Sequence, residues 1–324
     1  MSKGTSMPTL PRRRFLTGMA AMTAATAASR FALAQSTSPF RVSVINDEIS
    51  QDFAHACEVA SKEFGMHWIE LRSMWNRNIV ALDEKEIGET RRLLDKYQLK
   101  VTDIASPLFK VDWPGAPKSK YSESKSFNAG YDMSQQDEVL DRAIAVAKVL
   151  KTDRIRCFDF WRLEDQAPHR EAMNEKLRNA AAKIGKQGMI LVLENEPACN
   201  TATAHEAVKV LSAVQERAFM LNWDPGNAGA SDETPYPDGY NLLPKDRIGH
   251  CHCKDVIKKG AKFDWAPMGG GIIDWTGQFK ALKRDGYHFA VSLETHWHGA
   301  GTPEESSRKS WAGMKKQLQE AEAL

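Results

Sequence analysis

The sequence predicts an α/β chain that folds as a single (β/α)8 TIM barrel. Short apolar, β-branched runs alternate with helical patterns from residue 40 onward. There are eight such runs, at 40–47, 67–72, 100–106, 154–160, 189–195, 219–224, 248–255 and 289–295. Eight strands, each followed by a helix, match the barrel, for which about 250 residues are typical. A doubly wound open sheet is the competing fold, but no G-x-G-x-x-G follows the first run.

The first 34 residues have the order of a secretory signal peptide. The stretch RRRFL at 12–16 precedes a run rich in Ala and Met, which ends in ALA at 32–34. The paired arginines resemble a twin-arginine signal, so we expect export to the periplasm. The apolar run has about 15 residues, too few for a comfortable span, and we expect no stable membrane insertion. The barrel domain is then 35–324.

Charge and cysteine content exclude two classes of protein. The chain has 44 Lys and Arg against 42 Asp and Glu, but residues 1–34 contain five of the cations and none of the acids. Without that segment 39 cations face 42 acids, and no basic excess remains to bind nucleic acid. The five cysteines are an odd number without the spacing of a disulfide framework, so we expect buried free thiols.

Helix starts can be read between the strands. The signals are Ser50, with a stop at Gly65; the capping-box pair Asp83 and Glu86; Ser134; and a second capping-box pair, Thr203 and Glu206. A long Pro-rich segment, 107–134, follows the third strand, and the sequence leaves open whether it closes over a substrate or forms an interface.

Four successive predicted strands end in side chains that can bind a metal. These are Glu194, Asp224, His252 and Glu294. In a barrel the carboxyl ends of the strands surround one opening, where active sites are built. A solvated loop carboxylate is the ordinary interpretation of a single acidic strand end, but four in succession predict a common site.

The stretch RIGHCHCKD, residues 247–255, contains four consecutive potential ligands. In a strand His250 and His252 point to one face while Cys251 and Cys253 point to the other, so the four cannot bind one ion. A disulfide between the cysteines is also disfavoured, because side chains two apart in a strand do not meet its geometry. We therefore expect the cysteines to pack against the helices and His252, nearer the strand end, to be the ligand.

Three carboxylates and one imidazole form a mostly oxygen site for one divalent ion. Such a set suits Mn²⁺, our first expectation, or Mg²⁺ and Co²⁺, and it tolerates Zn²⁺. It leaves positions open for two oxygens of a substrate.

Several stretches together resemble the xylose-isomerase-like barrels, the family of sugar phosphate isomerases and epimerases. They are LVLENEP, LNWDPGN, HCHCKD, GGGIIDW and VSLETH, with weaker matches at NDEISQDF, IELR and IASPLFK. The resemblance covers nearly all of 35–324. It implies one ion bound by Glu194, Asp224, His252 and Glu294, with Glu194 and Glu294 also catalytic, moving protons on opposite faces of an enediolate.

The early strand ends depart from one branch of that family. Endonuclease IV has additional histidines there, whereas this chain has Glu48, Glu70 and Ser106, which argues against a three-metal phosphodiesterase. The residues that we expect to bind substrate are Glu48, Lys110, Trp113, Glu196 and Lys254. The lysines could equally be surface or salt-bridged residues, and Trp113 could be packing.

The sequence therefore predicts a metal-dependent sugar isomerase or epimerase that acts through an enediolate on a keto-sugar or sugar derivative. One alternative is a lyase or hydratase acting on 3-keto-glycosides, which uses the same intermediate. Another is a periplasmic sugar-binding barrel without activity. We expect a small carbohydrate as the partner, and a homo-oligomer is compatible with the sequence.

Overall fold

The computed structural model describes residues 38–122, 130–260 and 262–324. The proposed signal peptide, 1–34, lies outside the described residues, and Pro39–Leu324 forms one compact unit. Each of the eight runs expected from the sequence forms a strand, and β5 extends two residues beyond its run. The strands are β1 (Arg41–Val44), β2 (Trp68–Leu71), β5 (Lys100–Leu108), β6 (Arg154–Cys157), β7 (Ile190–Glu194), β8 (Phe219–Trp223), β9 (Ile248–Cys253) and β12 (Ala290–Leu293).

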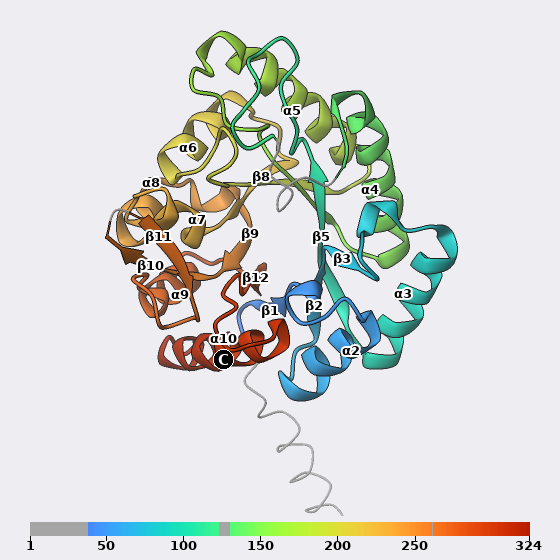
Figure 1. Ribbon diagram of the computed structural model, residues 1–324, viewed down its shortest axis with the longest axis vertical. Coiled ribbons are helices and arrows are strands. Elements are labelled where there is room, and N and C mark those ends of the chain that lie inside the picture. Colours follow the sequence, from blue (N-terminus) through green and yellow to red (C-terminus); the bar gives the residue numbers. More distant parts are fainter. Residues whose placement is uncertain (1–37, 123–129, 261) are drawn as a thin grey trace, which may run out of the picture. The chain divides into compact units, whose positions relative to one another are not determined.

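These strands form one parallel sheet in the order β1-β12-β9-β8-β7-β6-β5-β2. A parallel bridge between Ile45 and Glu70 joins its two ends. Figure 1 shows the strands as an inner ring surrounded by helices, which confirms the predicted barrel. The four strands that were predicted to end in ligands, β7, β8, β9 and β12, are neighbours in this order.

The outer layer consists of helices that follow the strands in chain order. They are α2 (Phe53–Glu58), α3 (Glu84–Tyr97), α4 (Gln136–Leu150), α5 (Arg170–Gly185), α6 (Ala204–Ala213), α7 (Pro225–Ala230), α8 (Tyr240–Leu242), α9 (Trp275–Arg284) and α10 (Pro303–Glu320). Short 3-10 or π turns are η1 (Asn46–Glu48), η2 (Val59–Glu63), η3 (Ile79–Ala81), η4 (Met133–Gln135), η5 (Ala167–His169), η6 (Pro235–Gly239) and η7 (Lys245–Arg247). In the described residues no helix is both long and apolar enough to cross a bilayer.

Two of the expected helix starts are wrong by two residues. The N-cap of α2 is Asp52, and Asp132 caps the turn that leads into α4, in place of Ser50 and Ser134. In each case an aspartate near the start accepts a backbone N–H, and a charged acceptor is the stronger cap. The expected stop at Gly65 is confirmed by its left-handed backbone, with φ of 71°.

The two expected capping boxes have different outcomes. Asp83 and Glu86 form a complete box at the start of α3. At α6, Thr203 accepts from the N–H of Glu206, but the Glu206 carboxylate accepts from Ala202 N and from Arg162. The sequence pattern at α6 therefore predicts the cap but not the partner of the glutamate, because Arg162 belongs to a distant loop.

Two antiparallel hairpins that the sequence did not indicate extend the barrel. One pairs β3 (Ser73–Met74) with β4 (Arg77–Asn78), and the other pairs β10 (Asp255–Lys259) with β11 (Lys262–Ala266). The run 248–255 was predicted as one strand, but β9 ends at Cys253 and Asp255 begins β10. The Asp255 carboxylate accepts backbone N–H groups from the stretch 269–273, which ties the hairpin to the loop before α9.

The main core lies between the outer faces of the strands and the helices, while the inner face of the barrel is unusually polar. All five cysteines are buried and free, as predicted, and Cys251 and Cys253 belong to this core. Ionisable residues enter the barrel interior from several strands, including Glu70, Asp103, Arg154 and Arg156, all at most 5% exposed. Barrel interiors are usually filled by branched apolar side chains. The polar filling therefore indicates a function at this level.

Candidate metal centre

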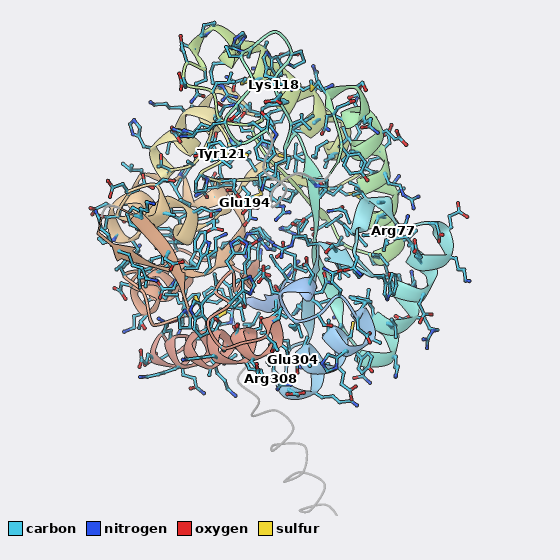
Figure 2. The ribbon with its side chains drawn as sticks, in the orientation of Figure 1. Arg77, Lys118, Tyr121, Glu194, Glu304 and Arg308 are labelled. Atoms are coloured by element: carbon cyan, nitrogen blue, oxygen red, sulfur yellow. The ribbon has the colours of Figure 1, made fainter. Side chains whose placement is uncertain are left out.

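The four predicted ligand residues meet inside the barrel at its carboxyl end. Glu194 ends β7, Asp224 follows β8 and caps α7, His252 lies in β9, and Glu294 follows β12. One ligand atom from each lies within 4.8 Å of the others, and none of the four residues is more than 2% exposed. Figure 2 places Glu194 inside the ring of strands and helices. The structure thus brings the four predicted ligand residues together.

The imidazole of His252 is the centre of the set. Its Nδ1 lies 3.4 Å from Glu194 Oε1, 3.6 Å from Asp224 Oδ2 and 3.3 Å from Glu294 Oε2. This nitrogen makes no hydrogen bond to any described residue although it is fully buried. A buried nitrogen surrounded by three carboxylate oxygens is the arrangement that a divalent cation would satisfy, so the donor set fits the expected metal.

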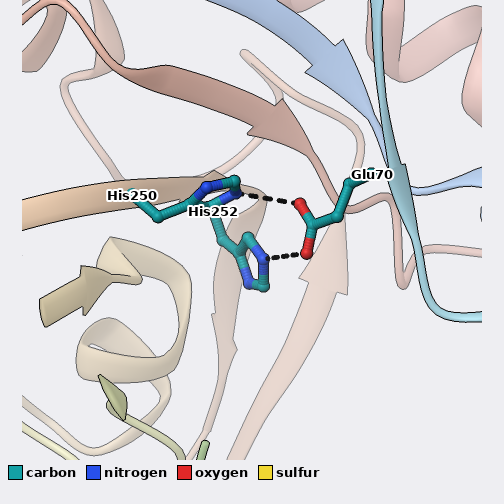
Figure 3. Close-up of side chains that lie close together, drawn as sticks. All are labelled: Glu70, His250 and His252. Carbon is teal, nitrogen blue, oxygen red and sulfur yellow. Dashed lines mark hydrogen bonds and ion pairs between the residues drawn. The ribbon is translucent and has the colours of Figure 1, made fainter. Parts of the chain in front are cut away.

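The other imidazole nitrogen of His252 is bound on the opposite side. Its Nε2 lies 3.0 Å from Glu70 Oε1, and His250 Nε2 lies 2.9 Å from Glu70 Oε2. Figure 3 shows the Glu70 carboxylate facing both histidine rings, with one oxygen directed at each. The same face of β9 therefore presents both histidines to Glu70, as strand alternation predicts.

Two of the acidic ligands, Glu194 and Glu294, are each paired with an arginine. Arg156 donates to Glu194 Oε2 at 3.0 Å, and Arg72 donates to Glu294 Oε1 at 2.8 Å. Burial opposes ionisation of Glu194, but Arg156 and His252 lower its pKa to about 2. Sequence reasoning missed both arginines. For Arg156 the sequence contained a signal. Arg154 and Arg156 alternate in the RIRC of β6, so they lie on the same face of that strand.

The ionised state of the remaining groups follows from the same network. Burial raises the pKa of Glu294, but His296, Lys254 and His252 outweigh it and hold that pKa well below its usual range. Burial lowers the pKa of His252, yet the surrounding carboxylates, Glu70 first, raise it well above its usual value. Without a metal, the carboxylates therefore favour the doubly protonated imidazolium form of His252.

Lys254 is a fully buried cation within the site. Its Nζ lies 2.8 Å from Asp224 Oδ2 and 2.5 Å from Glu294 Oε2, and it lies 5.1 Å from the centre of the Trp265 ring. A Cβ on Gly226 would lie only 2.4 Å from Lys254 Cγ, so glycine is required for the lysine to take this path. The predicted substrate-binding residue Lys254 is thus in direct contact with two candidate metal ligands.

The other substrate-binding candidates divide into two groups. Glu48 adjoins the ligands, because it shares Arg72 with Glu294 and accepts from His296 N at 3.1 Å. Lys110 and Glu196 form an ion pair with each other, with 3.3 Å between Nζ and Oε2.

Aromatic rings lie on both sides of these candidates. The ring of Trp113 packs edge-on against Phe160, with 4.7 Å between the ring centres, and Lys110 Nζ lies 4.3 Å from the centre of the Phe158 ring.

Two neighbours of Glu294 and Lys254 were not among the predicted site residues. His296 lies 3.2 Å from Glu294 Oε1, and its ring is 5.2 Å from that of Trp265. The hairpin that contains Trp265 was not predicted, so its place near the site could not be foreseen.

Comparison with known proteins supports the same fold. A probable 3-DHS dehydratase, AsbF, from Bacillus anthracis is 20% identical, with a TM-score of 0.64 over 85% of this chain and 97% of the other. A D-allulose 3-epimerase from Methylomonas sp. is 16% identical, with a TM-score of 0.60 over 87% and 98%. A xylose isomerase-like TIM barrel protein from Mycobacterium smegmatis, in complex with magnesium, is 16% identical, with a TM-score of 0.62 over 83% and 89%.

No curated protein sequence matches the chain. The family model described as xylose isomerase-like TIM barrel matches residues 59–317, which is most of the chain and includes all four candidate ligands. The protein therefore belongs to the xylose isomerase-like TIM barrel family.

Proposed function

We propose that this protein is a divalent-metal-dependent sugar isomerase or epimerase that acts through an enediolate on a keto-sugar or a sugar derivative. The observation that carries the proposal is the convergence of Glu194, Asp224 and Glu294 on Nδ1 of buried His252, an atom that makes no hydrogen bond to the described residues. Family membership supports it, since the structurally similar proteins include an epimerase.

The four residues would hold one divalent ion, with Mn²⁺ as the first candidate and Mg²⁺, Co²⁺ or Zn²⁺ as alternatives. When bound, such an ion lowers the pKa of the carbon beside a coordinated carbonyl by stabilising negative charge on oxygen. The structurally similar protein from Mycobacterium smegmatis is in complex with magnesium, which supports a hard cation as the ion of this chain.

Glu194 and Glu294 are the proposed catalytic residues. One carboxylate takes a proton from the carbon beside the carbonyl, which leaves an enediolate, and the other returns a proton to the opposite face or to the neighbouring carbon. They lie on β7 and β12, the two outer strands of the four that carry ligands. Arg156, Arg72 and Lys254 keep both carboxylates ionised, and a base must start in that form.

The proposed substrate contacts are Glu48, Lys110, Trp113, Glu196 and Lys254. Lys254 and Glu48 flank Glu294 and would face the reacting carbons, while Lys110, Glu196 and Trp113 would bind more distant hydroxyls or a ring face. The twin-arginine pattern in 1–34 supports export, and we propose the periplasm as the location.

A lyase or hydratase on 3-keto-glycosides is the second candidate, and Lys254 favours it. An ammonium beside Glu294 could protonate a departing oxygen after the carboxylate has removed the neighbouring proton. The similarity to a probable dehydratase supports this possibility.

The test is proton exchange in deuterated water. The protein is stripped of metal, reloaded with Mn²⁺, incubated with free ketoses and 3-keto-glycosides, and the sugars are followed by NMR. We expect metal-dependent deuterium beside a carbonyl, and the products would separate epimerase, isomerase and lyase. Glu194→Gln and Glu294→Gln should each reduce exchange by about 10²-fold or more.

Glu58→Gln is the matched control, because Glu58 on α2 pairs with Lys62 far from the barrel interior. It should exchange at the unaltered rate. Exchange at that rate in both Glu194→Gln and Glu294→Gln would refute the catalytic assignment. Bound metal and bound sugar without exchange would instead indicate a sugar-binding barrel.

A further inference from the structure

We infer that Glu70 is a positioning residue for the metal centre, fixing His252 so that Nδ1 faces the three carboxylates. This inference rests on the proposed function in so far as it concerns a metal ion. Glu70 lies on β2, across the barrel from the four strands that carry the ligands.

The hydrogen bonds of Glu70 determine which nitrogen of His252 has the free lone pair. A carboxylate accepts hydrogen bonds, so the 3.0 Å contact requires a proton on Nε2 of His252. A metal-bound imidazole carries one proton, which leaves Nδ1 as the ligand atom. That nitrogen is the one that lies 3.3–3.6 Å from the three carboxylate oxygens.

The second oxygen of Glu70 is used by His250, which fixes the carboxylate itself. His250 Nε2 lies 2.9 Å from Oε2, and all three side chains are completely buried. A carboxylate bound at both oxygens cannot rotate without breaking a hydrogen bond. The plane of the Glu70 carboxylate, and through it the ring of His252, is therefore fixed by these two hydrogen bonds (Figure 3).

Glu70, His250 and His252 also have the composition of a metal site of their own, and their ligand atoms lie within 4.8 Å. The contacts favour the hydrogen-bonded interpretation. Both imidazoles direct Nε2 at a different oxygen of one carboxylate, so each N–H has an acceptor. An ion here would have a single acid ligand, whereas the neighbouring set provides three.

Asn222 is a further neighbour of the same nitrogen. Its Nδ2 lies 3.1 Å from His252 Nε2, while its Oδ1 has no partner among the described residues. The side-chain amide of Asn222 has nearly the same shape in its two flipped orientations. In the flipped orientation its Oδ1 accepts from the Nε2 N–H of His252. Both neighbours of Nε2 then accept, which agrees with a proton on that atom.

The test combines metal affinity with a signal from the histidine ring. In Glu70→Gln the neutral amide is a weaker acceptor and cannot accept from both histidines. We expect Mn²⁺ affinity, measured by titration calorimetry, to fall about 10–100-fold, as for other partners of metal-bound histidines. The absorption spectrum of the Co²⁺-loaded protein should change as well. Asp103→Asn is the matched control, since Asp103 is an equally buried interior carboxylate without a hydrogen bond to either histidine.

Nitrogen-15 NMR of histidine-labelled, metal-free protein separates this inference from the proposed function. We expect a strongly hydrogen-bonded N–H on His252 Nε2, shifted in Glu70→Gln and retained in Asp103→Asn. If the unaltered protein binds no divalent ion, the proposed function fails, but the N–H signal still tests the role of Glu70.

Three results would overturn the inference. They are a metal-free His252 whose Nε2 N–H shows no strong hydrogen bond, unchanged Mn²⁺ affinity in Glu70→Gln, or a second bound ion that is lost in both Glu70→Gln and His250→Gln. Thermal unfolding of the metal-free variants identifies a variant that fails to fold. In that case the NMR measurement on the unaltered protein decides the question.

Discussion

At the scale of single residues, Lys254 is the side chain whose replacement measures how much its positive charge stabilises the buried carboxylates of Asp224 and Glu294. It is a fully buried ammonium between Asp224 and Glu294. Lys254→Met leaves two buried carboxylates without this partner, and loss of one member of a buried ion pair costs about 3–5 kcal/mol. We expect a loss of that order in the free energy of urea unfolding with EDTA present. With Mn²⁺ the loss should be smaller, because the ion supplies positive charge to the same oxygens.

Lys110→Met is the control for this experiment, because Lys110 pairs with Glu196, which is not a candidate ligand. Its effect on unfolding should not depend on Mn²⁺. An equal loss of stability for Lys254→Met with and without Mn²⁺ would contradict the proposal that Lys254 and the metal ion lie beside the same carboxylates.

Residue chemistry also explains which site residues could be predicted. Glu194, Asp224, His252 and Glu294 each end an apolar run, where a packed strand does not need a charge, so pattern alone indicated them. Glu70 and Arg72 were not linked to the ligands, because they act from β2 and from the residue that follows it, through contacts that only barrel closure creates. Their partners are more than 150 positions away in the chain.

At the scale of elements, the start of α6 depends on an ionised carboxylate. Glu206 accepts from Ala202 N at 2.7 Å and from Arg162 at 2.6 Å. Burial raises its pKa, but these bonds outweigh burial and lower it. The stabilisation is therefore present above the unfolded-state pKa of about 4.3 and is lost as pH falls through the folded-state value. Glu206→Gln should cost about 1 kcal/mol at pH 7, a value reduced for partial exposure, and less at pH 3.

Glu233, near the start of the same helix, has a pKa shift in the opposite direction to that of Glu206. It accepts from Ala204 N, but burial raises its pKa. Its ionisation thus lowers stability as pH rises through the folded-state value, so the relative stability of Glu233→Gln should improve from pH 4 to pH 7. Urea unfolding of both variants across this range is the measurement, and parallel pH profiles would disprove the assignment.

At the scale of the whole molecule, the metal would join four strands of the barrel. Ligands from β7, β8, β9 and β12 meet only in the folded chain, so an ion binds the native state and hardly binds the unfolded one. At 100 times the dissociation constant, Mn²⁺ should stabilise the fold by about 2.7 kcal/mol relative to protein with EDTA. Differential scanning calorimetry checks this, and the double variant Glu194→Gln, Glu294→Gln should show no such rise. A rise of the same size in the double variant would place the ion elsewhere.

The sequence by itself determined the barrel and the residues at its strand ends. Periodicity marks strands and helices because burial of alternate or every third to fourth residue is a local requirement, and eight alternations allow few folds. Strand alternation also separated His250 and His252 from Cys251 and Cys253, which the buried free cysteines confirm.

Only the tertiary structure decided how those residues are supported. Barrel closure brings Glu70 to His252, Arg72 to Glu294 and Arg156 to Glu194. The β10–β11 hairpin places Trp265 beside Lys254. These contacts join residues from separate strands and loops, and their protonation states follow from burial and opposite charge at about 3 Å. No local pattern encodes such distances, because they exist only when the ring of strands has closed.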